Sequence, residues 1–565
     1  MKKERSLVSG TISNFIKLLD LYLQQRKLKI FIVCYALLVS TIFQVVIFWP
    51  AYLVQLREYQ DIFPLGWDPP RYAGYAKIIM QGNYMRPILE GGDIRIIYYI
   101  IAWISCIFHI DVKISTALLI HVFLSLFNLF STLLVFLITR DYLATLSTAT
   151  ILPLMNITLR LYSLPSQLFT SVLSQLLLIL VYLMINTKRI VKNVSMTITI
   201  LLSLIFLSHW YYDFLSLCLS LLLFGLFSYL GRKVSFQVLK GIVLGLFFST
   251  IFTLFFLPLA LIKVKQWSLG SLWSAYSPFL LQPIFFEEIW NDSFLFAGIW
   301  ILGLIYAIIS FVRGLRISRS SKELPLIAFC CVGLTGLGIL LFGLLMYNDA
   351  YQERAFIVGM TYILPFLGLW QVSRLVRKTL YKNKFIIALL LRKKKYIIAL
   401  DFTKLVYALI IILLVSSIYP SAETYRAKYL TVYIDPKTYS LFRTWDLSPY
   451  ARPIILMKGL YYGAALSYIN YLMMLHGDIY FYYGSVWHLY NLTEDSGIAD
   501  IKERSLSKFT VFLLEQNNLD RSEIKNHHVL VSDLLYQPVD IPEEYISIYN
   551  LTIRYFYGKP FTKRG

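Results

Sequence analysis

Long apolar stretches separated by short polar ones run along most of this chain. The stretch from Ile30 to Val54 shows the length involved, because a helix needs about 20 residues to cross a hydrocarbon core about 30 Å thick. Such stretches predict membrane-spanning helices, and the expected fold class is an all-α polytopic membrane domain. We expect eleven spans, at residues 30–54, 114–138, 142–158, 166–186, 195–210, 212–230, 241–262, 294–312, 324–346, 355–372 and 402–420.

The pattern changes after the last predicted span. Short apolar runs such as Pro453–Met457, Asp478–Tyr483 and His528–Val531 alternate there with helical stretches such as Ala464–Leu475. This alternation predicts a small α/β domain over residues 421–565, after a transmembrane domain at 30–420.

The segment before the first span, residues 1–29, has its own pattern. Apolar residues recur in it at helical spacing, which predicts an amphipathic helix. Two placements fit this helix equally well: flat on the inner membrane face, or packed on the cytoplasmic ends of the spans. The residues that form its apolar stripe are Ile12, Phe15, Ile16, Leu19, Tyr22 and Leu23.

The basic residues indicate which side each span end faces. The net charge is +21, and Lys and Arg gather at every second gap between apolar stretches, as at Lys188–Lys192, Arg232–Lys240 and Arg374–Lys395. This is the positive-inside pattern of membrane proteins, so the charge is explained without a nucleic-acid partner. We therefore expect a multi-pass cell-membrane protein with a cytoplasmic N-terminus. An odd number of spans places the C-terminal domain outside the cytoplasm.

Three sequons lie in segments predicted to be outside, at Asn291, Asn491 and Asn550. They agree with that topology, although such triplets are common by chance. The five cysteines lie in or beside apolar stretches without metal-ligand spacing. Neither a disulfide framework nor a zinc site is therefore predicted.

The first outer loop, residues 55–113, is predicted to hold two helices. Pro69 and Pro70 favour a helix start, so we expect a helix from Arg71 to Gln81 that Gly82 ends. The second segment, Arg95 to Phe108, is apolar and aromatic but shorter than the roughly 17 residues that a span needs. We expect it to lie flat at the outer membrane interface.

Asp68, just before the first of these helices, is the leading candidate for chemistry. A carboxylate at a helix N-terminus is stabilised as the anion, and at the membrane surface it could act as a general base. The alternative is a helix cap with no chemical role.

The residues around Asp68 resemble a known family. The run Asp68-Pro-Pro-Arg-Tyr-Ala-Gly-Tyr-Ala-Lys-Ile-Ile-Met-Gln-Gly-Asn-Tyr is followed by a short aromatic helix, Ile96-Ile-Tyr-Tyr-Ile-Ile-Ala-Trp, and then by a span. This order resembles the GT-C superfamily of membrane glycosyltransferases, which includes protein mannosyltransferases, aminoarabinose transferases and the catalytic subunit of oligosaccharyltransferase. The motif-level match is confined to the first outer loop. The composition, rich in Ile, Lys and Tyr, resembles archaeal members.

The resemblance implies that Asp68 is catalytic or binds a required metal, and it makes Arg71 a substrate-binding candidate. Family members often have a second acid in the outer turn between spans three and four. This chain departs there, because residues 156–167 contain no acid. The departure puts a two-carboxylate metal site in doubt. No cofactor is predicted with certainty, and a divalent metal is one option.

Three further residues are weighed as substrate-binding candidates. Asp213 and His209, at the predicted outer turn between spans five and six, could supply the missing acid or simply form a hydrogen-bonded pair. Polar groups in such apolar surroundings need partners or a wet cavity. The resemblance suggests that Arg354 contacts the phosphate of a lipid-linked sugar, and Arg suits bidentate phosphate binding. Its alternative role is an interfacial anchor or a partner of nearby acids.

The expected function is transfer of a sugar from a polyprenyl- or dolichyl-phosphate donor to a protein or lipid-glycan acceptor at the outer face. Membrane lipid, the lipid-linked donor and the acceptor are the expected partners. Two other interpretations stay open: a transporter or flippase of lipid-linked glycans, and a non-catalytic membrane assembly protein. Paired discontinuous helices or a repeat of halves would favour a transporter, and the sequence shows neither.

Overall fold

The computed structural model describes part of the chain, and the statements below concern that part. The described residues are 26–66, 68–82, 84, 95–185, 187–256, 291, 293–316, 323–346, 362–380, 384–391, 394–430, 453–458, 509–516, 534–535 and 551–554. The predicted amphipathic helix lies almost entirely outside these residues. Arg354 lies outside them as well.

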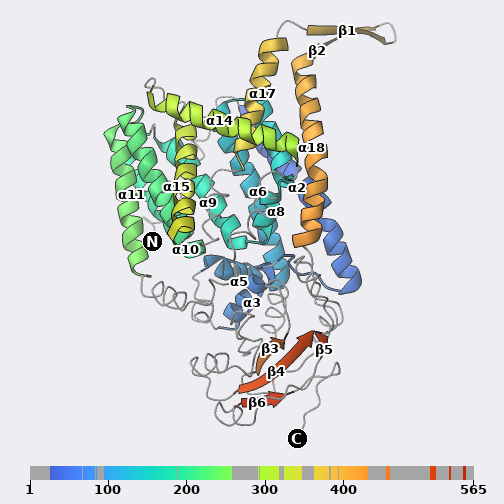
Figure 1. Cartoon of the computed structure of the whole chain (residues 1–565), viewed down its shortest axis with the longest axis vertical. Coiled ribbons are helices and arrows are strands. Elements are labelled where there is room, and N and C mark those ends of the chain that lie inside the picture. The colour runs from blue at the N-terminus through green and yellow to red at the C-terminus, as the bar shows by residue number, and fades with distance from the viewer. Residues whose placement is uncertain are drawn as a thin grey trace.

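The described part is mostly helical, as expected for a polytopic membrane protein (Figure 1). By length and composition, eight of its helices could cross a membrane, and one bent pair could make a ninth. The prediction of eleven spans is therefore not confirmed. The eight candidate spans lie in seven helices, of which α10 holds two spans. These helices are α2 (Arg26–Glu58), α6 (Val112–Thr139), α9 (Pro165–Met184), α10 (Ile190–Leu230), α11 (Phe236–Leu254), α14 (Phe294–Arg316) and α18 (Phe402–Tyr429). Two further long helices are α15 (Leu324–Met346) and α17 (Leu364–Leu380).

Helix α10 covers two of the predicted spans and the turn between them, yet it is not straight. A Cβ at Gly241 of α11 would lie 3.2 Å from Cα of Val191, and one at Gly225 would lie 3.1 Å from Leu239. In a straight helix, residues 191 and 225 would be about 50 Å apart. Both nevertheless contact the same stretch of α11. The two halves of α10 therefore fold back on each other, as two separate spans would.

The predicted span at 142–158 is broken in the structure. Helix α7 (Tyr142–Ile151) continues through the short 3₁₀ helix η1 (Leu152–Leu154), and α8 (Asn156–Tyr162) then leaves with a bend of 55°. A break inside a membrane exposes backbone groups that must find partners within the protein. The side chain of Asn291 supplies them at this break.

Asn291 makes three hydrogen bonds across the break. Its Oδ1 accepts from the backbone N of Asn156 at 3.1 Å, and its Nδ2 donates to Leu154 O at 3.1 Å and to Asn156 Oδ1 at 3.0 Å. The residue is fully buried. The Asn291 sequon is therefore buried in the structure, and its location on the outer side stays a prediction.

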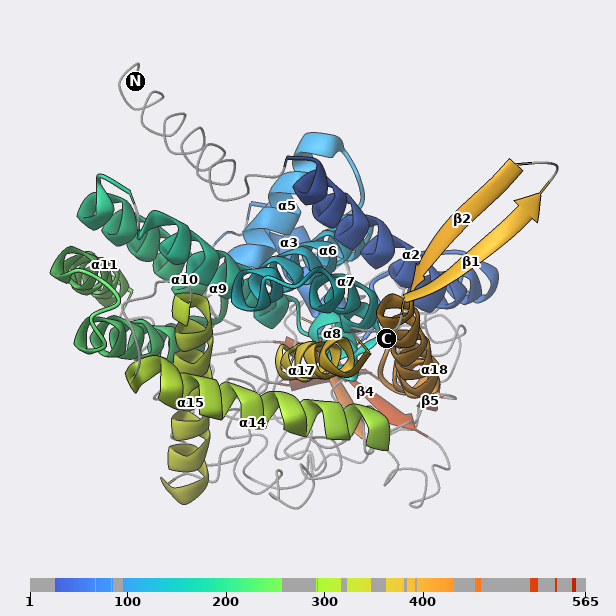
Figure 2. The ribbon, with the colours of Figure 1, turned by 90° about the horizontal axis from the view of Figure 1, so that it is seen from above.

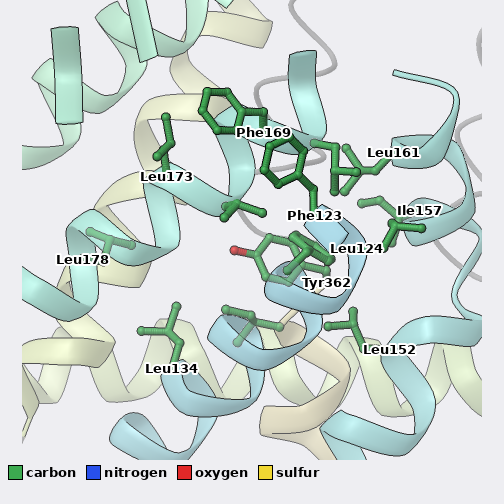
Figure 3. Close-up of a cluster of buried hydrophobic side chains, with 14 of the residues drawn as sticks. Phe123, Leu124, Leu134, Leu152, Ile157, Leu161, Phe169, Leu173, Leu178 and Tyr362 are labelled. Atoms are coloured by element: carbon green, nitrogen blue, oxygen red, sulfur yellow. The ribbon is translucent and has the colours of Figure 1, made fainter. Parts of the chain in front are cut away.

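The apolar core lies where α6, α8 and α9 meet (Figure 3). The rings of Phe123 and Phe169 lie 4.8 Å apart, and Phe127 lies 5.1 Å from Tyr362, which precedes α17. Helices α14 and α17 approach closely through glycines, since a Cβ on Gly303 would fall on the backbone of α17. Small residues at helix contacts are typical of membrane proteins.

Six strands lie outside the bundle. The strands β1 (Lys384–Leu391) and β2 (Lys394–Asp401) form an antiparallel hairpin, which the sequence analysis did not predict. A mixed sheet joins β3 (Pro453–Lys458), β4 (Phe509–Gln516), β5 (Leu534–Leu535) and β6 (Leu551–Arg554). The predicted run Pro453–Met457 is thus a strand. The α/β class of residues 421–565 is not confirmed, because most of this region lies outside the described residues.

The hairpin and the mixed sheet lie at opposite ends of the bundle (Figure 1). The first outer loop contributes α3 (Pro69–Met80) and α5 (Ile96–Phe108), close to the bounds predicted for its two helices. Both helices lie at the same end as the mixed sheet. The same view shows α14 running across the direction of most long helices, so its length alone does not make it a span.

Candidate functional site

Two contacts hold the beginning of the loop before α3. The amide of Gln55 closes its beginning, because Nε2 donates to Phe63 O at 3.0 Å and Oε1 accepts from Phe63 N at 3.2 Å. An ion pair with Nζ–Oδ1 at 2.5 Å joins Lys113, at the start of α6, to Asp61. These contacts, one buried and one partly buried, fix the start of the stretch of chain that leads to Asp68.

Gly66 brings this loop against the turn between α8 and α9. Its φ of +90° is a conformation that favours glycine, and a Cβ there would lie 3.0 Å from Cβ of Ser163. The loop before α3 therefore lies directly on the turn between α8 and α9.

Asp68 occupies the N-cap position of α3 but does not cap it. Its backbone is in the right-handed helical region, at φ −87° and ψ −32°, and its carboxylate accepts no capping hydrogen bond. A cap normally has extended backbone and binds the N–H of the second or third helical residue. Pro70, at the second position, has no N–H to offer. The half-buried carboxylate of Asp68 is thus not used by the helix end.

Arg95 lies within electrostatic range of Asp68 and connects three elements. It precedes α5, and its Nη1 donates a hydrogen bond to the hydroxyl of Tyr72 on α3. That hydroxyl also hydrogen-bonds Ser166 Oγ at the start of α9, and since it accepts from Arg95 we assign it as the donor to Ser166. The helices of the first outer loop are thereby tied to the turn that Gly66 contacts.

The neighbours of Arg95 keep its guanidinium protonated. Burial alone would lower the pKa of its guanidinium, but the nearby Tyr72, Tyr98 and Asp68 side chains raise the pKa above its ordinary value. Arg95 therefore remains a cation next to Asp68. Its Cζ lies 5.5 Å from the centre of the Tyr72 ring, within cation–π range.

Aromatic rings complete the wall beside the charged groups. Tyr98 of α5 lies 4.8 Å from Tyr72 and 5.0 Å from Tyr75, and Arg71 Cζ lies 5.4 Å from the Tyr75 ring. Burial raises the pKa of Tyr98 above its ordinary value, so this hydroxyl stays neutral. The site thus combines one carboxylate, two guanidinium groups and three tyrosines.

A buried network of hydrogen bonds joins three helices next to the site. The hydroxyl of Tyr52 on α2 lies 2.6 Å from that of Tyr162 on α8 and 3.1 Å from Nε2 of His121 on α6. Nδ1 of His121 lies 3.0 Å from Gln44 Oε1. Because an amide oxygen only accepts, Nδ1 carries the proton and Nε2 accepts from Tyr52. The network ties three helices together beneath the Gly66 loop.

Not all predicted site residues can be placed relative to one another. Asp68 and Arg71 lie three positions apart at the start of α3, and the structure adds Arg95, which the sequence analysis had treated only as a helix start. Asp213 is half-buried in the second half of α10. His209 lies in the same helix, but its side chain is not among the described ones. Convergence of Asp213, His209 and Arg354 on Asp68 stays a prediction.

In the part of the chain that the structure describes, the same residues do not form a recognisable metal-binding site. Among the described side chains, no group of three His, Cys, Asp or Glu residues is placed to hold an ion. Asp68 has basic and aromatic neighbours rather than further acids. The described part of the site therefore does not supply a ligand set, and no chemical step is assigned to a metal below.

Comparisons with known proteins gave structural neighbours only. No family model matches the chain, and no curated protein matches its sequence. The apo oligosaccharyltransferase of Archaeoglobus fulgidus is similar at a TM-score of 0.49 and 13% identity, over 80% of this chain and 64% of that one. The same enzyme in complex with Zn and sulfate gives 0.46 and 14%, over 79% and 62%. This chain thus spans less than two thirds of that protein, and similarity at this level does not establish function or substrate.

Proposed function

We propose that this chain is a membrane glycosyltransferase that transfers a sugar from a polyprenyl- or dolichyl-phosphate donor to an acceptor at the outer membrane face. The observation that carries the proposal is the state of Asp68. Its carboxylate is half-buried and makes no cap hydrogen bond. It also interacts electrostatically with Arg95, which Tyr72 holds by a hydrogen bond. The resemblance of the first outer loop to the GT-C pattern supplies the reaction class.

In the proposed reaction Asp68 is the general base. It takes the proton of the acceptor nucleophile as that atom attacks the anomeric carbon of the donor sugar. The bond between that carbon and the phosphate oxygen breaks, and the phosphate leaves on its lipid with the bonding electrons. Arg95 and Arg71 lie where cations could stabilise the charge that grows on the phosphate. The tyrosine wall offers the sugar an apolar and hydrogen-bonding surface.

The lipid tail gives a reason for the position of the site. A donor on a polyprenyl chain keeps its phosphate near the membrane surface, and α3 and α5 lie at one end of the helical bundle (Figure 1). Arg354, which the sequence analysis assigned to the donor phosphate, stays a candidate for the same role. Asp213 stays the candidate second acid.

The test is Asp68→Asn in the full-length protein reconstituted in membranes with a lipid-phosphate sugar donor. Because Asp68 makes no cap hydrogen bond, the substitution should leave folding unchanged. Loss of a general base should slow transfer about 10²- to 10⁴-fold. Asp111→Asn is the matched control, since Asp111 ends the same loop and caps α6 through Lys113 N at 3.0 Å, which Asn can also do. Wild-type transfer by Asp68→Asn would contradict the assignment of the base.

A further inference from the structure

A small cavity lies between α2, α6 and the break that follows α7. Figure 2, seen from above, shows α2, α6, α7 and α8 grouped together. The cavity has a volume of about 10 Å³, and most of its lining residues are apolar. The polar side chains that line it are Ser40 and Gln44 of α2, Asn128 of α6 and Thr158 of α8.

Asn128 uses both hydrogens of its side-chain amide on backbone carbonyls. Its Nδ2 donates to Ala36 O of α2 at 3.1 Å and to Ala149 O of α7 at 3.3 Å. Ala149 O needs a donor from outside its helix, because its helical partner would be the N–H of residue 153, which is a proline. The two carbonyls also fix which way the amide points, since an amide oxygen in that position could only repel them.

The oxygen of the same amide is an acceptor that still needs a donor. Asn128 is 1% exposed, and its Oδ1 has no hydrogen-bond partner among the described residues. A buried acceptor without a donor is costly, and inside a membrane no bulk water can supply one. Because Asn128 lines the cavity, the donor for its Oδ1 can come from there.

The other polar groups of the cavity wall complement this acceptor. Gln44 commits both hydrogens of Nε2, to Ser40 Oγ at 3.0 Å and to Ser125 Oγ at 3.1 Å. Ser40 therefore accepts from Gln44, and its own proton has no acceptor among the described residues. Thr158 gives its proton to Leu152 O at 2.7 Å, so its oxygen can only accept a further bond. Together with the amide oxygen, the wall offers one donor and two acceptors.

We propose that this cavity binds one water molecule, which accepts a hydrogen bond from Ser40 and donates one each to Asn128 Oδ1 and Thr158 Oγ1. The volume suits a single water, because about 10 to 15 Å³ is the least that holds one. About three hydrogen bonds is also the usual number for a buried water. The bound water joins α2, α6 and α8 where the chain breaks its helix inside the bundle.

The water extends the hydrogen-bond network that the Tyr52 hydroxyl makes with Tyr162 and His121. Gln44 accepts from His121 at 3.0 Å and donates to Ser40, so the water links that network to Asn128. Ordered water is one of the ways in which a broken helix in a membrane finds partners for its polar groups. The inference does not depend on the proposed enzymatic function.

A density map of the full-length protein in lipid nanodiscs tests the site directly, at a resolution that shows ordered water elsewhere in the protein. We expect a separate peak at hydrogen-bond distance, about 2.5 to 3.2 Å, from both Asn128 Oδ1 and Ser40 Oγ. A clear map without this peak, or with Ser40 bonded directly to Asn128, would overturn the proposal. Elongated density that continues into the bilayer would do so as well, because it would show a lipid chain in the cavity.

A double-mutant cycle tests whether the water links α2 to α6. Ser40→Ala removes the donor, and Asn128→Leu removes the acceptor with little change of side-chain volume. Because the two groups share one water, Ser40→Ala should lower the ratio of folded to unfolded protein about fivefold less in the Asn128→Leu background than in the wild type. The ratio is measured by unfolding in mixed micelles titrated with a denaturing detergent.

The matched control replaces the neighbouring hydroxyl on α2. Thr41 bonds Leu37 O at 2.9 Å and is not among the residues that line the cavity. Thr41→Ala and Asn128→Leu should therefore have additive effects. Additive effects of Ser40→Ala and Asn128→Leu would contradict a shared water. Should Asn128→Leu fail to fold, the density at the wild-type cavity decides.

Discussion

Two aspartates that precede helices, Asp68 before α3 and Asp141 before α7, are used in different ways. Asp141 has extended backbone, and its Oδ1 accepts from Leu143 N at 2.8 Å and Ala144 N at 3.3 Å. Its other oxygen pairs with Arg377, and the residue is buried. Asp68 has helical backbone and caps nothing. Part of the difference follows from Pro70, which has no N–H at the position where Leu143 donates to Asp141, while Asp68 does not accept from the remaining N–H of Arg71 at the third position.

The comparison distinguishes a carboxylate that the helix end uses for cap hydrogen bonds from one that it does not use. A helix start is by itself ambiguous, since aspartate there is most often a cap. What distinguishes Asp68 is that its carboxylate makes no cap hydrogen bond and that it acts electrostatically on Arg95. The sequence alone left the roles of base and cap open, and the role of base stays a proposal.

Removing the two carboxylates should therefore lower stability by unequal amounts. Asp141→Ala loses a cap and a half-exposed ion pair, which should lower the free energy of unfolding by about 2 kcal/mol. Asp68→Ala loses no cap hydrogen bond, only its electrostatic interaction with Arg95, and should lower it by about 1 kcal/mol at most. Unfolding in mixed micelles titrated with a denaturing detergent measures both. A loss at Asp68 equal to that at Asp141 would show that Asp68 is a structural residue after all.

A second pair of substitutions tests whether the site is held as described. Tyr72→Phe removes the hydroxyl that joins Arg95 to Ser166, and it should lower the free energy of unfolding by about 1 kcal/mol. Tyr98→Phe is its matched control, because the buried Tyr98 hydroxyl has no hydrogen-bond partner among the described residues. The control should be neutral.

The transfer assay gives the pair a second measurement. Tyr72→Phe should also weaken donor binding, since Arg95 loses a contact that orients it, and Tyr98→Phe, which leaves that contact in place, should weaken donor binding less. Equal effects of the two substitutions would mean that the Arg95–Tyr72–Ser166 connection does not position the site.

The sequence was most informative where a pattern is local. Proline pairs and a closing glycine predicted α3 within about two residues, as expected for helix boundaries. The length of the apolar segment at 95–108 predicted a helix too short to span, and α5 is that helix. Its placement at the outer interface stays a prediction.

Features that depend on distant residues could not be predicted in this way. The bend between α7 and α8 is supported by Asn291, about 135 positions further along the chain. Ser166 joins Tyr72 because the Gly66 loop lies on the α8–α9 turn, a contact that no periodicity encodes. The hairpin was missed because its apolar strands lie inside a basic cluster that the positive-inside pattern already explained.

The last prediction is that Asn291 is not glycosylated in the folded protein. Its sequon has the right residues, but a glycan is attached through the side-chain Nδ2, whose two hydrogens already bond Leu154 O and Asn156 Oδ1. Reaching that atom would require opening the break between α7 and α8. A peptide of residues 287–297 carries the same triplet without these partners and should be glycosylated by an added oligosaccharyltransferase. The intact protein, given the same enzyme, should remain unmodified at Asn291 when its peptides are analysed by mass spectrometry. A glycan at Asn291 in the folded protein would show that the bend opens, and Asn291 would then belong with Asp68 among the polar groups that the fold leaves available.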